Sequence, residues 1–159
     1  MTQRVGLGYD VHRVKAGRPL VLGGVRFESD WGLVGHSDAD VVAHAVGDAL
    51  LGAAGLGDLG EHFPPGDPKW KDASSLDLLS RIATLLKENG ARALNVDAMV
   101  VAESPKIAPH RAEMCANIAR SLGVEASCVS VKATTNETLG AIGRREGLAA
   151  MAVAMVERS

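Results

Sequence analysis

Three residues in the first third of the sequence are of types that bind transition metals. Asp10 and His12 stand two positions apart in residues 4–12, whose alternating pattern favours a β-strand. Side chains two apart in a strand leave the same face, so both can reach one ion. His44 would supply a third ligand. Two imidazoles and a carboxylate suit Zn²⁺ with its fourth position left open, as in catalytic zinc sites.

The spacing alone is a weak signal, because a surface aspartate–histidine pair and an unrelated helix histidine give the same pattern. On the helix predicted after Ser37, positions 40, 44 and 48 follow i, i+4, i+8 and share one stripe. That polar stripe either faces water or places Asp40 or Asp48 next to the metal ligands or the substrate. The residues themselves leave both possibilities open.

Two other segments carry groups that bind phosphate. His36 and Ser37 precede the predicted helix, whose first N–H groups favour anions. Residues 132–137 (KATTNE) end a predicted strand with hydroxyls, an amide and a carboxylate. The hydroxyls can donate to phosphate, and Glu137 suits Mg²⁺ or Mn²⁺. Arg144 can bind phosphate in bidentate fashion. A polar turn before a short capped helix would explain residues 132–137 equally well.

Helix signals occur three times along the chain. A cap and an apolar period predict a helix from Ser37 or Asp38 to the glycine-rich residues 52–60. Ser74 with Asp77 resembles a capping box that opens a second helix ending near Asn89–Gly90. Pro109 is expected to open a third helix that ends at Gly123. Residues 59–71, rich in proline and glycine, are predicted to be a surface loop.

The remaining segments favour strands. These are residues 4–12, a hairpin at 18–29 around Gly23–Gly24, and residues 94–102, 127–135 and 147–159. The order strand, helix, helix, strand, helix, strand predicts one α/β (α+β) sandwich domain over residues 1–159, with helices on one face of a single sheet. The last strand is apolar on both sides, so we expect the uncovered sheet face to meet another subunit.

Composition excludes several function classes. The 17 basic and 19 acidic residues give a net charge of −2 and form no basic run, which argues against nucleic-acid binding. Cys115 and Cys128 belong to no paired motif, which fits a reducing compartment. No apolar run approaches a membrane span or a signal segment, so a cytoplasmic protein without membrane contact is expected.

Five spaced motifs occur in an order that is far more specific than any one of them. They are GxGxDxH at 6–12, HSDAD at 36–40 followed by His44, LGDLG at 56–60, ESPK at 103–106 and KATTNE at 132–137. Together they resemble the 2-C-methyl-D-erythritol 2,4-cyclodiphosphate synthase family over nearly the whole chain. The resemblance implies a homotrimer whose active sites lie between subunits, with one sheet face toward the trimer axis.

The resemblance also assigns roles to individual positions. Asp10, His12 and His44 match the zinc ligands, and Glu137 matches the residue that helps to hold Mg²⁺ or Mn²⁺ on the substrate phosphates. His36 and Thr135 match positions that stabilise the transition state. Residues 58–60 and 63–67 match contacts to the methylerythritol phosphate, 102–108 and 134–137 match cytidine and phosphate contacts, and Arg144 matches a diphosphate contact. The substrate positions are Ser37, Asp58, Leu59, Gly60, Phe63, Pro64, Pro65, Gly66, Asp67, Ala102, Glu103, Ser104, Pro105, Lys106, Ile107, Ala108, Thr134, Asn136, Ala141 and Arg144.

Two positions depart from the family pattern. Pro65 stands where some relatives carry Asp, and Ala141 where some carry a bulkier aromatic residue; neither position belongs to the set of metal ligands. The implied substrate is nucleotide-linked: 4-diphosphocytidyl-2-C-methyl-D-erythritol 2-phosphate, whose 2-phosphate attacks its own β-phosphorus and expels CMP. A trimeric binding module for a nucleotide or isoprenoid diphosphate and a metal-dependent phosphohydrolase are the alternative functions.

Overall fold

The computed structural model describes residues 1–159, and its central feature is a mixed five-stranded sheet. The sheet order is β4 (Trp31–Leu33), β1 (Thr2–Ala16), β7 (Gly147–Arg158), β5 (Ala91–Val101) and β6 (Val129–Thr134). Only β5 and β6 are parallel; the other pairs are antiparallel. The predicted hairpin is confirmed as a separate two-stranded sheet of β2 (Leu20–Leu22) and β3 (Val25–Phe27).

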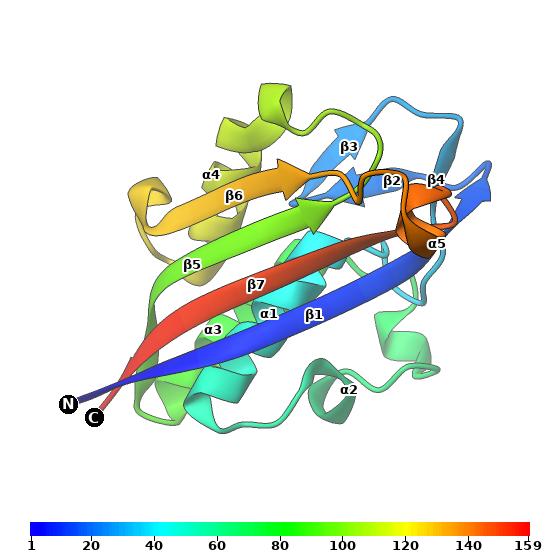
Figure 1. Cartoon of the computed structure of the whole chain (residues 1–159). Coiled ribbons are helices and arrows are strands. Elements are labelled where there is room, and N and C mark those ends of the chain that lie inside the picture. The colour runs from blue at the N-terminus through cyan, green and yellow to red at the C-terminus, as the bar shows by residue number, and fades with distance from the viewer.

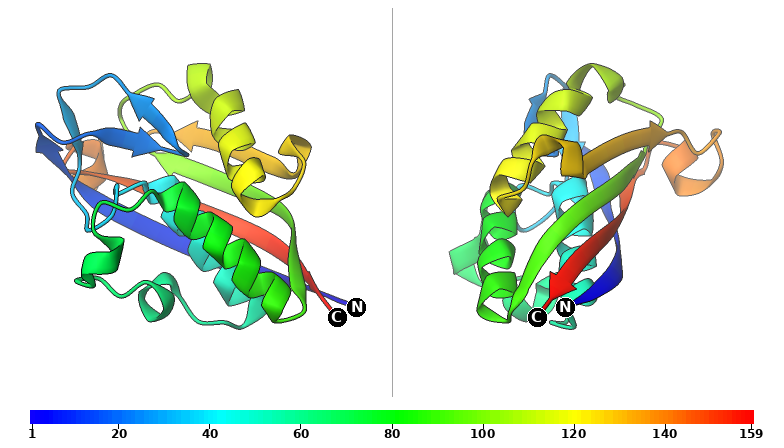
Figure 2. Two further views of the ribbon diagram at one scale, coloured as in Figure 1. Left: turned by 180° about the vertical axis from the view of Figure 1, so that it is seen from behind. Right: turned by 90° about the vertical axis from the view of Figure 1, so that its left-hand side faces the viewer.

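The main helices cover one face of this sheet (Figures 1 and 2). They are α1 (Val41–Ala54), α3 (Ser75–Glu88) and α4 (Arg111–Leu122). The two views of Figure 2 show the helices in one layer and the strands in another, with the two chain ends side by side. The predicted fold class, a sheet with helices on one face, is therefore confirmed. No helix combines the length and apolar character that a bilayer crossing needs.

Helix α1 lies directly against strand β1 because two glycines remove side chains from the contact. A Cβ on Gly6 would overlap the carbonyl oxygen of Ala49, and one on Gly8 would overlap that of Ala45. The buried face of α1 is built largely from alanine and valine, which also permits close approach. This contact fixes how far a side chain on α1 stands from one on β1.

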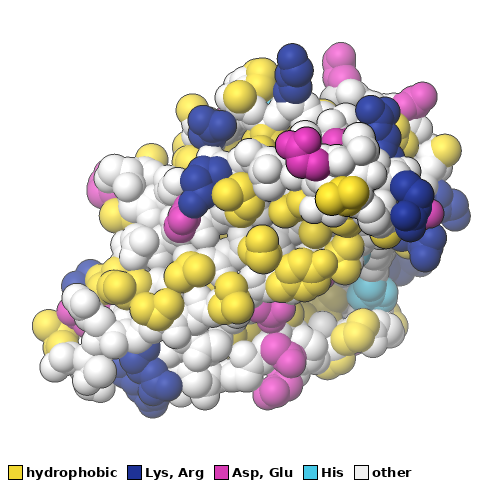
Figure 3. Space-filling model, viewed as in Figure 1, with side chains coloured by type: hydrophobic (Ala, Val, Ile, Leu, Met, Phe, Trp, Pro, Cys, Tyr) yellow, Lys and Arg dark blue, Asp and Glu magenta, His cyan; other side chains and the backbone are white.

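The opposite face of the sheet is apolar and exposed. Successive residues of β1 point to opposite faces of the sheet. Those that face the helices are covered, and those that face the other side are exposed. The large exposed apolar residues of β1 and β7, each at least 42 % exposed, are Val5, Leu7, Tyr9, Val11, Met151 and Val153. Figure 3 shows apolar side chains running along these two strands. A face of this kind is typical of a protein–protein contact.

One predicted helix start is wrong, and one predicted helix cap does not form. The first helix begins at Val41 rather than at Ser37 or Asp38, because the buried side chain of Asp40 forms the N-cap. The second begins after Ser74 as predicted, but the capping box with Asp77 does not form, since Ser74 makes no side-chain capping bond.

The loop and turn regions contain more regular structure than predicted. Residues 59–71 include the short helix α2 (Leu59–His62) and a 3₁₀ turn at Pro68–Trp70, because Asp58 and Asp67 each cap a turn that proline composition alone does not reveal. The helix expected from Pro109 begins at Arg111 after a 3₁₀ turn at Ala108–His110. Strand β4 was not predicted, since it is too short to show a period. The short helix α5 (Gly140–Gly143) follows residues 132–137, as one of the two interpretations of that segment allowed.

Candidate metal centre and active site

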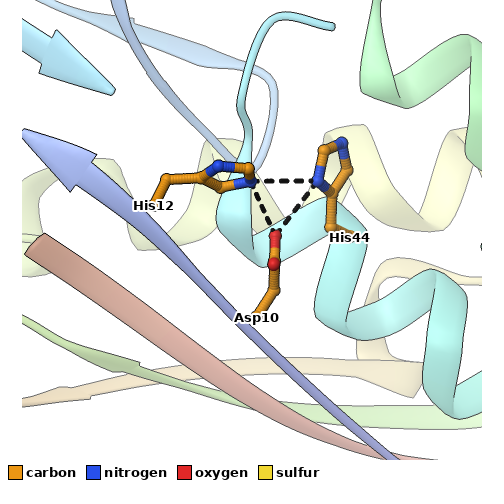
Figure 4. A group of neighbouring side chains, drawn as sticks. All are labelled: Asp10, His12 and His44. Atoms are coloured by element: carbon orange, nitrogen blue, oxygen red, sulfur yellow. Dashed lines mark hydrogen bonds and ion pairs between the residues drawn. The ribbon is translucent and has the colours of Figure 1, made fainter. Parts of the chain in front are cut away.

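Asp10, His12 and His44 meet at one point between β1 and α1 (Figure 4). Asp10 Oδ2 lies 2.8 Å from His12 Nε2 and 3.0 Å from His44 Nδ1, and these two nitrogens are 3.3 Å apart. One donor atom from each residue therefore lies within 4.8 Å of the others. The convergence predicted from the sequence is confirmed, and each side chain is partly buried.

The hydrogen bonds of both histidines leave the facing nitrogen free to bind an ion. His12 Nδ1 donates to the carbonyl oxygen of Val34 at 2.8 Å, which leaves the lone pair of Nε2 toward the centre. His44 presents Nδ1 to the centre, while its Nε2 faces the hydroxyls of Ser37 and Ser75 at 3.0 and 2.9 Å. Metal-binding imidazoles are usually oriented in this way, by a hydrogen bond on the other nitrogen.

The charges of the three residues are complementary. Burial opposes ionisation of Asp10, but hydrogen bonds and charge from His12 and His44 outweigh it and lower the pKa of Asp10 to about 2. Burial likewise disfavours a charged His44, yet the carboxylate of Asp10 outweighs it and raises the pKa of His44. An ionised carboxylate beside two imidazoles is the donor set of a Zn²⁺ site, so these residues fit such an ion.

A cavity of about 260 Å³ opens beside the three residues. Its walls come from β1, the loop before α1, α1 itself, the segment from α2 to Trp70, and α3. The lining residues are Asp10, His12, His36, Ser37, His44, Asp48, Leu59, Gly60, Phe63, Pro65, Trp70 and Leu78. Larger cavities elsewhere, such as one of about 740 Å³ beside the chain ends, contain no comparable set of metal-binding residues.

Asp48 ties the cavity wall to α1. Its Oδ1 accepts a hydrogen bond from the backbone N–H of Leu59 at 2.9 Å, and burial raises its pKa. Farther along the same wall, His36 Nε2 donates to the carbonyl oxygen of Asp67 at 2.8 Å. The start of α2 and the segment that follows this helix are thus each held by a side chain that lines the cavity, Asp48 and His36 respectively. Asp48 lines the cavity beside the metal ligands. This agrees with the interpretation that the polar stripe on the helix faces the metal ligands or the substrate.

Asp40 fits neither interpretation of that stripe. It is fully buried, and its carboxylate accepts hydrogen bonds from Val42 N and Ala43 N of α1 and from Gly23 N and Gly24 N of the hairpin, at 2.8–3.2 Å. Burial and the charge of Asp38 raise the pKa of Asp40 to about 6 against these donors. Asp40 therefore joins the β2–β3 hairpin to the start of α1.

Replacing Asp40 by alanine is expected to destabilise the fold strongly. The change removes a helix cap and leaves buried N–H groups without partners, which together cost roughly 2–4 kcal/mol. Asp40→Asn keeps an acceptor oxygen and should cost less. Urea unfolding of both variants measures the effect, with the exposed Asp77→Ala as the control. Equal stability of Asp40→Ala and the native chain would contradict this role.

A family model described as the YgbB family matches residues 3–157 of the chain. The chain belongs to the YgbB family. The match extends over both layers of the fold. The resemblance noted from the spaced motifs is therefore confirmed.

Individual relatives of the YgbB family cover the chain almost completely. The 2-C-methyl-D-erythritol 2,4-cyclodiphosphate synthase of Symbiobacterium thermophilum is 61 % identical over 96 % of this chain and 97 % of its own length. An IspF structure from Plasmodium falciparum in complex with CDP is 33 % identical, with a TM-score of 0.86 over 99 % of this chain and 97 % of its own. The bifunctional IspDF of Campylobacter jejuni is 43 % identical, with a TM-score of 0.95. This match covers 99 % of the present chain and 43 % of the Campylobacter jejuni chain.

The ESPK and KATTNE motifs lie at a second place, where β5 and β6 end. Glu103 Oε1 accepts a hydrogen bond from Thr138 N at 2.9 Å, which joins the loop after β5 to the loop after β6. Glu137 has a positive φ of 53° and donates its N–H to Thr135 Oγ1 at 3.2 Å. Arg144 is exposed and pairs with Glu146. The loops that follow β5 and β6 are thus joined to each other.

The two groups of candidate residues do not line a common cavity in one chain. None of the residues from 102–108 or 134–144 contributes to the wall beside the metal centre. His36, Ser37, Leu59, Gly60, Phe63 and Pro65 do line it, whereas Asp58, Pro64, Gly66 and Asp67 do not. The sequence analysis missed Trp70, Leu78 and Ser75 at this site. Only Trp70, a lone tryptophan in a proline-rich segment, carried a local signal.

Proposed function

We propose that this chain converts 4-diphosphocytidyl-2-C-methyl-D-erythritol 2-phosphate to 2-C-methyl-D-erythritol 2,4-cyclodiphosphate and CMP in the non-mevalonate route to isoprenoid precursors. The enzyme would act as a phosphorus–oxygen lyase. The observation that carries the proposal is the convergence of Asp10, His12 and His44 beside a cavity, in a chain whose near-full-length relatives bear this name. Two unpaired cysteines, Cys115 and Cys128, support a cytoplasmic location.

The reaction needs little covalent help from the protein. The 2-phosphate attacks the β-phosphorus of the same molecule, the new P–O bond closes the ring, and the bond to CMP breaks. Both partners are negatively charged, so the site must fold the substrate for in-line attack and neutralise the charge that accumulates. We assign this neutralisation to donors from His36, Thr135 and Arg144.

Two divalent ions complete the proposed site. Asp10, His12 and His44 would hold Zn²⁺, and Glu137 would help to hold Mg²⁺ or Mn²⁺ on the phosphates. When bound, such ions withdraw charge from phosphate oxygens and orient them. The protein's own contribution is to fix the ligands, as the carbonyl oxygen of Val34 does for His12.

An assembled site would need more than one chain. The metal centre and the 102–108 and 134–144 segments do not share a cavity, and the outer face of β1 and β7 is apolar and exposed. Both observations support the homotrimer implied by the family resemblance, with the exposed sheet faces toward the axis and each active site between neighbours.

Product analysis tests the proposed reaction against its two alternatives. The purified chain is supplied with Zn²⁺, Mg²⁺ and the candidate substrate, and the products are followed by ³¹P NMR. We expect CMP and a cyclic diphosphate in equal amounts. Binding without turnover would support the binding module instead. CMP accompanied only by linear phosphates would support a metal-dependent phosphohydrolase.

Glu137→Gln should weaken the response to the second ion without releasing the first. Gln keeps the shape but lacks the charge that Mg²⁺ prefers. Activity titrated with Mg²⁺ is expected to need a higher ion concentration for half-maximal rate, while the Zn²⁺ content per chain stays native. Glu113→Gln, on the outer surface of α4, is the control. Loss of Zn²⁺ from Glu137→Gln would contradict the separate roles of the two sites.

Leu7→Glu should break the assembly. Leu7 is 70 % exposed in the single chain, so the change disturbs the monomer little, but a trimer would bury the new charge near the axis. Sedimentation should show a trimer for the native chain and a smaller species for Leu7→Glu. Thr84→Glu, on the helix side, is expected to remain trimeric. A native monomer, or a Leu7→Glu trimer, would contradict the proposed assembly.

A further inference from the structure

The side of His44 that faces away from the metal centre is occupied by a residue with no assigned role. In Figure 4 one ring nitrogen of His44 points toward Asp10 and His12, and the other points away from them. That second nitrogen, Nε2, lies 2.9 Å from the hydroxyl oxygen of Ser75. Ser75 is the first residue of α3, 31 positions farther along the chain, and it is fully buried.

The single hydroxyl proton of Ser75 is already engaged. Ser75 Oγ–H donates to Asp38 Oδ1, and Ser75 N–H donates to Asp38 Oδ2 at 2.9 Å. A carboxylate only accepts, so the proton between these two oxygens belongs to the serine. The Ser75 oxygen can then interact with His44 only as an acceptor. Such an arrangement requires the proton of the neutral His44 ring to sit on Nε2.

Asp38 is itself held firmly in place. Its Oδ1 also accepts from Asp40 N at 3.1 Å, and its own N–H donates to the carbonyl oxygen of Ala73 at 3.1 Å. Asp38 thereby joins the loop before α1 to the start of α3, where Ser74 provides no side-chain cap. The absent capping box and the burial of Ser75 have one explanation: the start of α3 is anchored to Asp38 instead.

We propose that Ser75, fixed by Asp38, is a positioning residue for the metal ligand His44. The chain of hydrogen bonds runs from His44 Nε2–H to Ser75 Oγ and from Ser75 Oγ–H to Asp38. It holds the ring in the tautomer that offers the Nδ1 lone pair to the ion and fixes the direction of that lone pair. The inference rests on the proposed zinc site and adds two residues to its support.

Ser37 cannot replace Ser75 in this role. Its hydroxyl also lies near His44 Nε2, at 3.0 Å, and accepts a long hydrogen bond from Ala39 N at 3.4 Å. No carboxylate engages the Ser37 proton, so this hydroxyl can either donate to or accept from the ring and does not select a tautomer. Ser75 does select one, because its own proton is committed to Asp38.

The test compares Zn²⁺ affinity in Ser75→Ala and in the native chain, measured by competition with a chromophoric chelator. Loss of such an outer hydrogen bond is expected to weaken Zn²⁺ binding by about 10–100-fold. Ser80→Ala is the matched control, because it removes an exposed hydroxyl from the same helix that bonds only to Leu76 O. Native affinity in a folded Ser75→Ala chain would overturn the proposal, whereas a native chain that takes up no Zn²⁺ would contradict the metal centre itself.

A second measurement uses the native chain and therefore does not depend on the variant folding. In the Zn²⁺-loaded protein with ¹⁵N-labelled histidine, we expect a His44 Nε2 proton that exchanges slowly with water and shows a nuclear Overhauser effect to the Ser75 Cβ protons. That signal should disappear in folded Ser75→Ala and persist in Ser80→Ala. Zn²⁺ bound through Nε2 of His44, or a rapidly exchanging Nε2 proton, would overturn the proposal.

Discussion

His44→Ala is expected to lose both bound Zn²⁺ and catalytic activity. His44 Nδ1 lies 3.0 Å from Asp10 Oδ2, and only one other imidazole reaches the centre. Removing it leaves two ligands, too few for a stable site. Metal stabilisation of a phosphoryl transition state is worth several kcal/mol, so the rate of CMP release should fall by about 10³-fold or more. Metal content by mass spectrometry and CMP release measure the two effects.

The folded state should survive this substitution. His44 is only partly buried, and the apolar positions of α1 that face the sheet are unchanged. The control is His110→Ala, which removes a histidine that packs on Phe27 outside the cavity. We expect it to keep Zn²⁺ and activity. Native activity in a zinc-free His44→Ala chain would show that the metal centre is not where the reaction occurs.

Gly8→Ala is expected to damage the fold and the metal centre together. The added methyl group would overlap the carbonyl oxygen of Ala45, a backbone atom that no side-chain rotation can move. Helix α1 must then shift away from β1, at a cost of about 1–3 kcal/mol or more for overpacking. Because Asp10 lies on β1 and His44 on α1, the same shift separates two metal ligands. Both unfolding free energy and Zn²⁺ affinity should fall.

A glycine on α1 provides the matched control. At Gly52 an added methyl group would have no atom within 4 Å, and the residue does not adopt a positive φ. Alanine is the better helix former, so Gly52→Ala should raise stability by about 0.5–1 kcal/mol and leave Zn²⁺ affinity unchanged. If Gly8→Ala matched Gly52→Ala in stability and affinity, the close packing of α1 on β1 would not be what sets the ligand spacing.

The periodicity of apolar residues predicted helices and strands wherever it extended over enough residues to be recognised. The strand that carries Asp10 and His12 and the helix that carries His44 form where their periodicity indicated, although the helix begins later than predicted, and the final strand forms where a run apolar on both sides favoured it. Strand β1 runs beyond residues 4–12 because twelve of its residues pair with β7, a partner that lies far away in sequence. Strand β4 has three residues and follows from pairing with β1, so its own sequence shows no period.

The metal centre was partly predictable for the same reason. Residues two apart in a strand must share a face, so the pairing of Asp10 with His12 follows from strand geometry alone. His44 was proposed as the third ligand from its residue type, and the family resemblance strengthened that prediction, because nothing local relates a strand residue to a helix residue 32 positions away. The stripe containing Asp40 and Asp48 was predicted as a unit, but the structure divides it: Asp40 is a buried cap, and Asp48 holds the cavity wall.

By itself, the sequence determined which chemistry is possible: the ligand types, their placement on a strand and a helix, and an apolar last strand that needs cover on both sides. The tertiary structure decided which of those groups meet. Contact between Gly8 and Ala45 sets the ligand separation, and the Asp38–Ser75 pair orients His44 across 31 residues. These contacts depend on packing between segments that are distant in sequence. They could not be predicted from the periodicity of apolar residues or from helix-capping residues, because these patterns relate only neighbours along the chain.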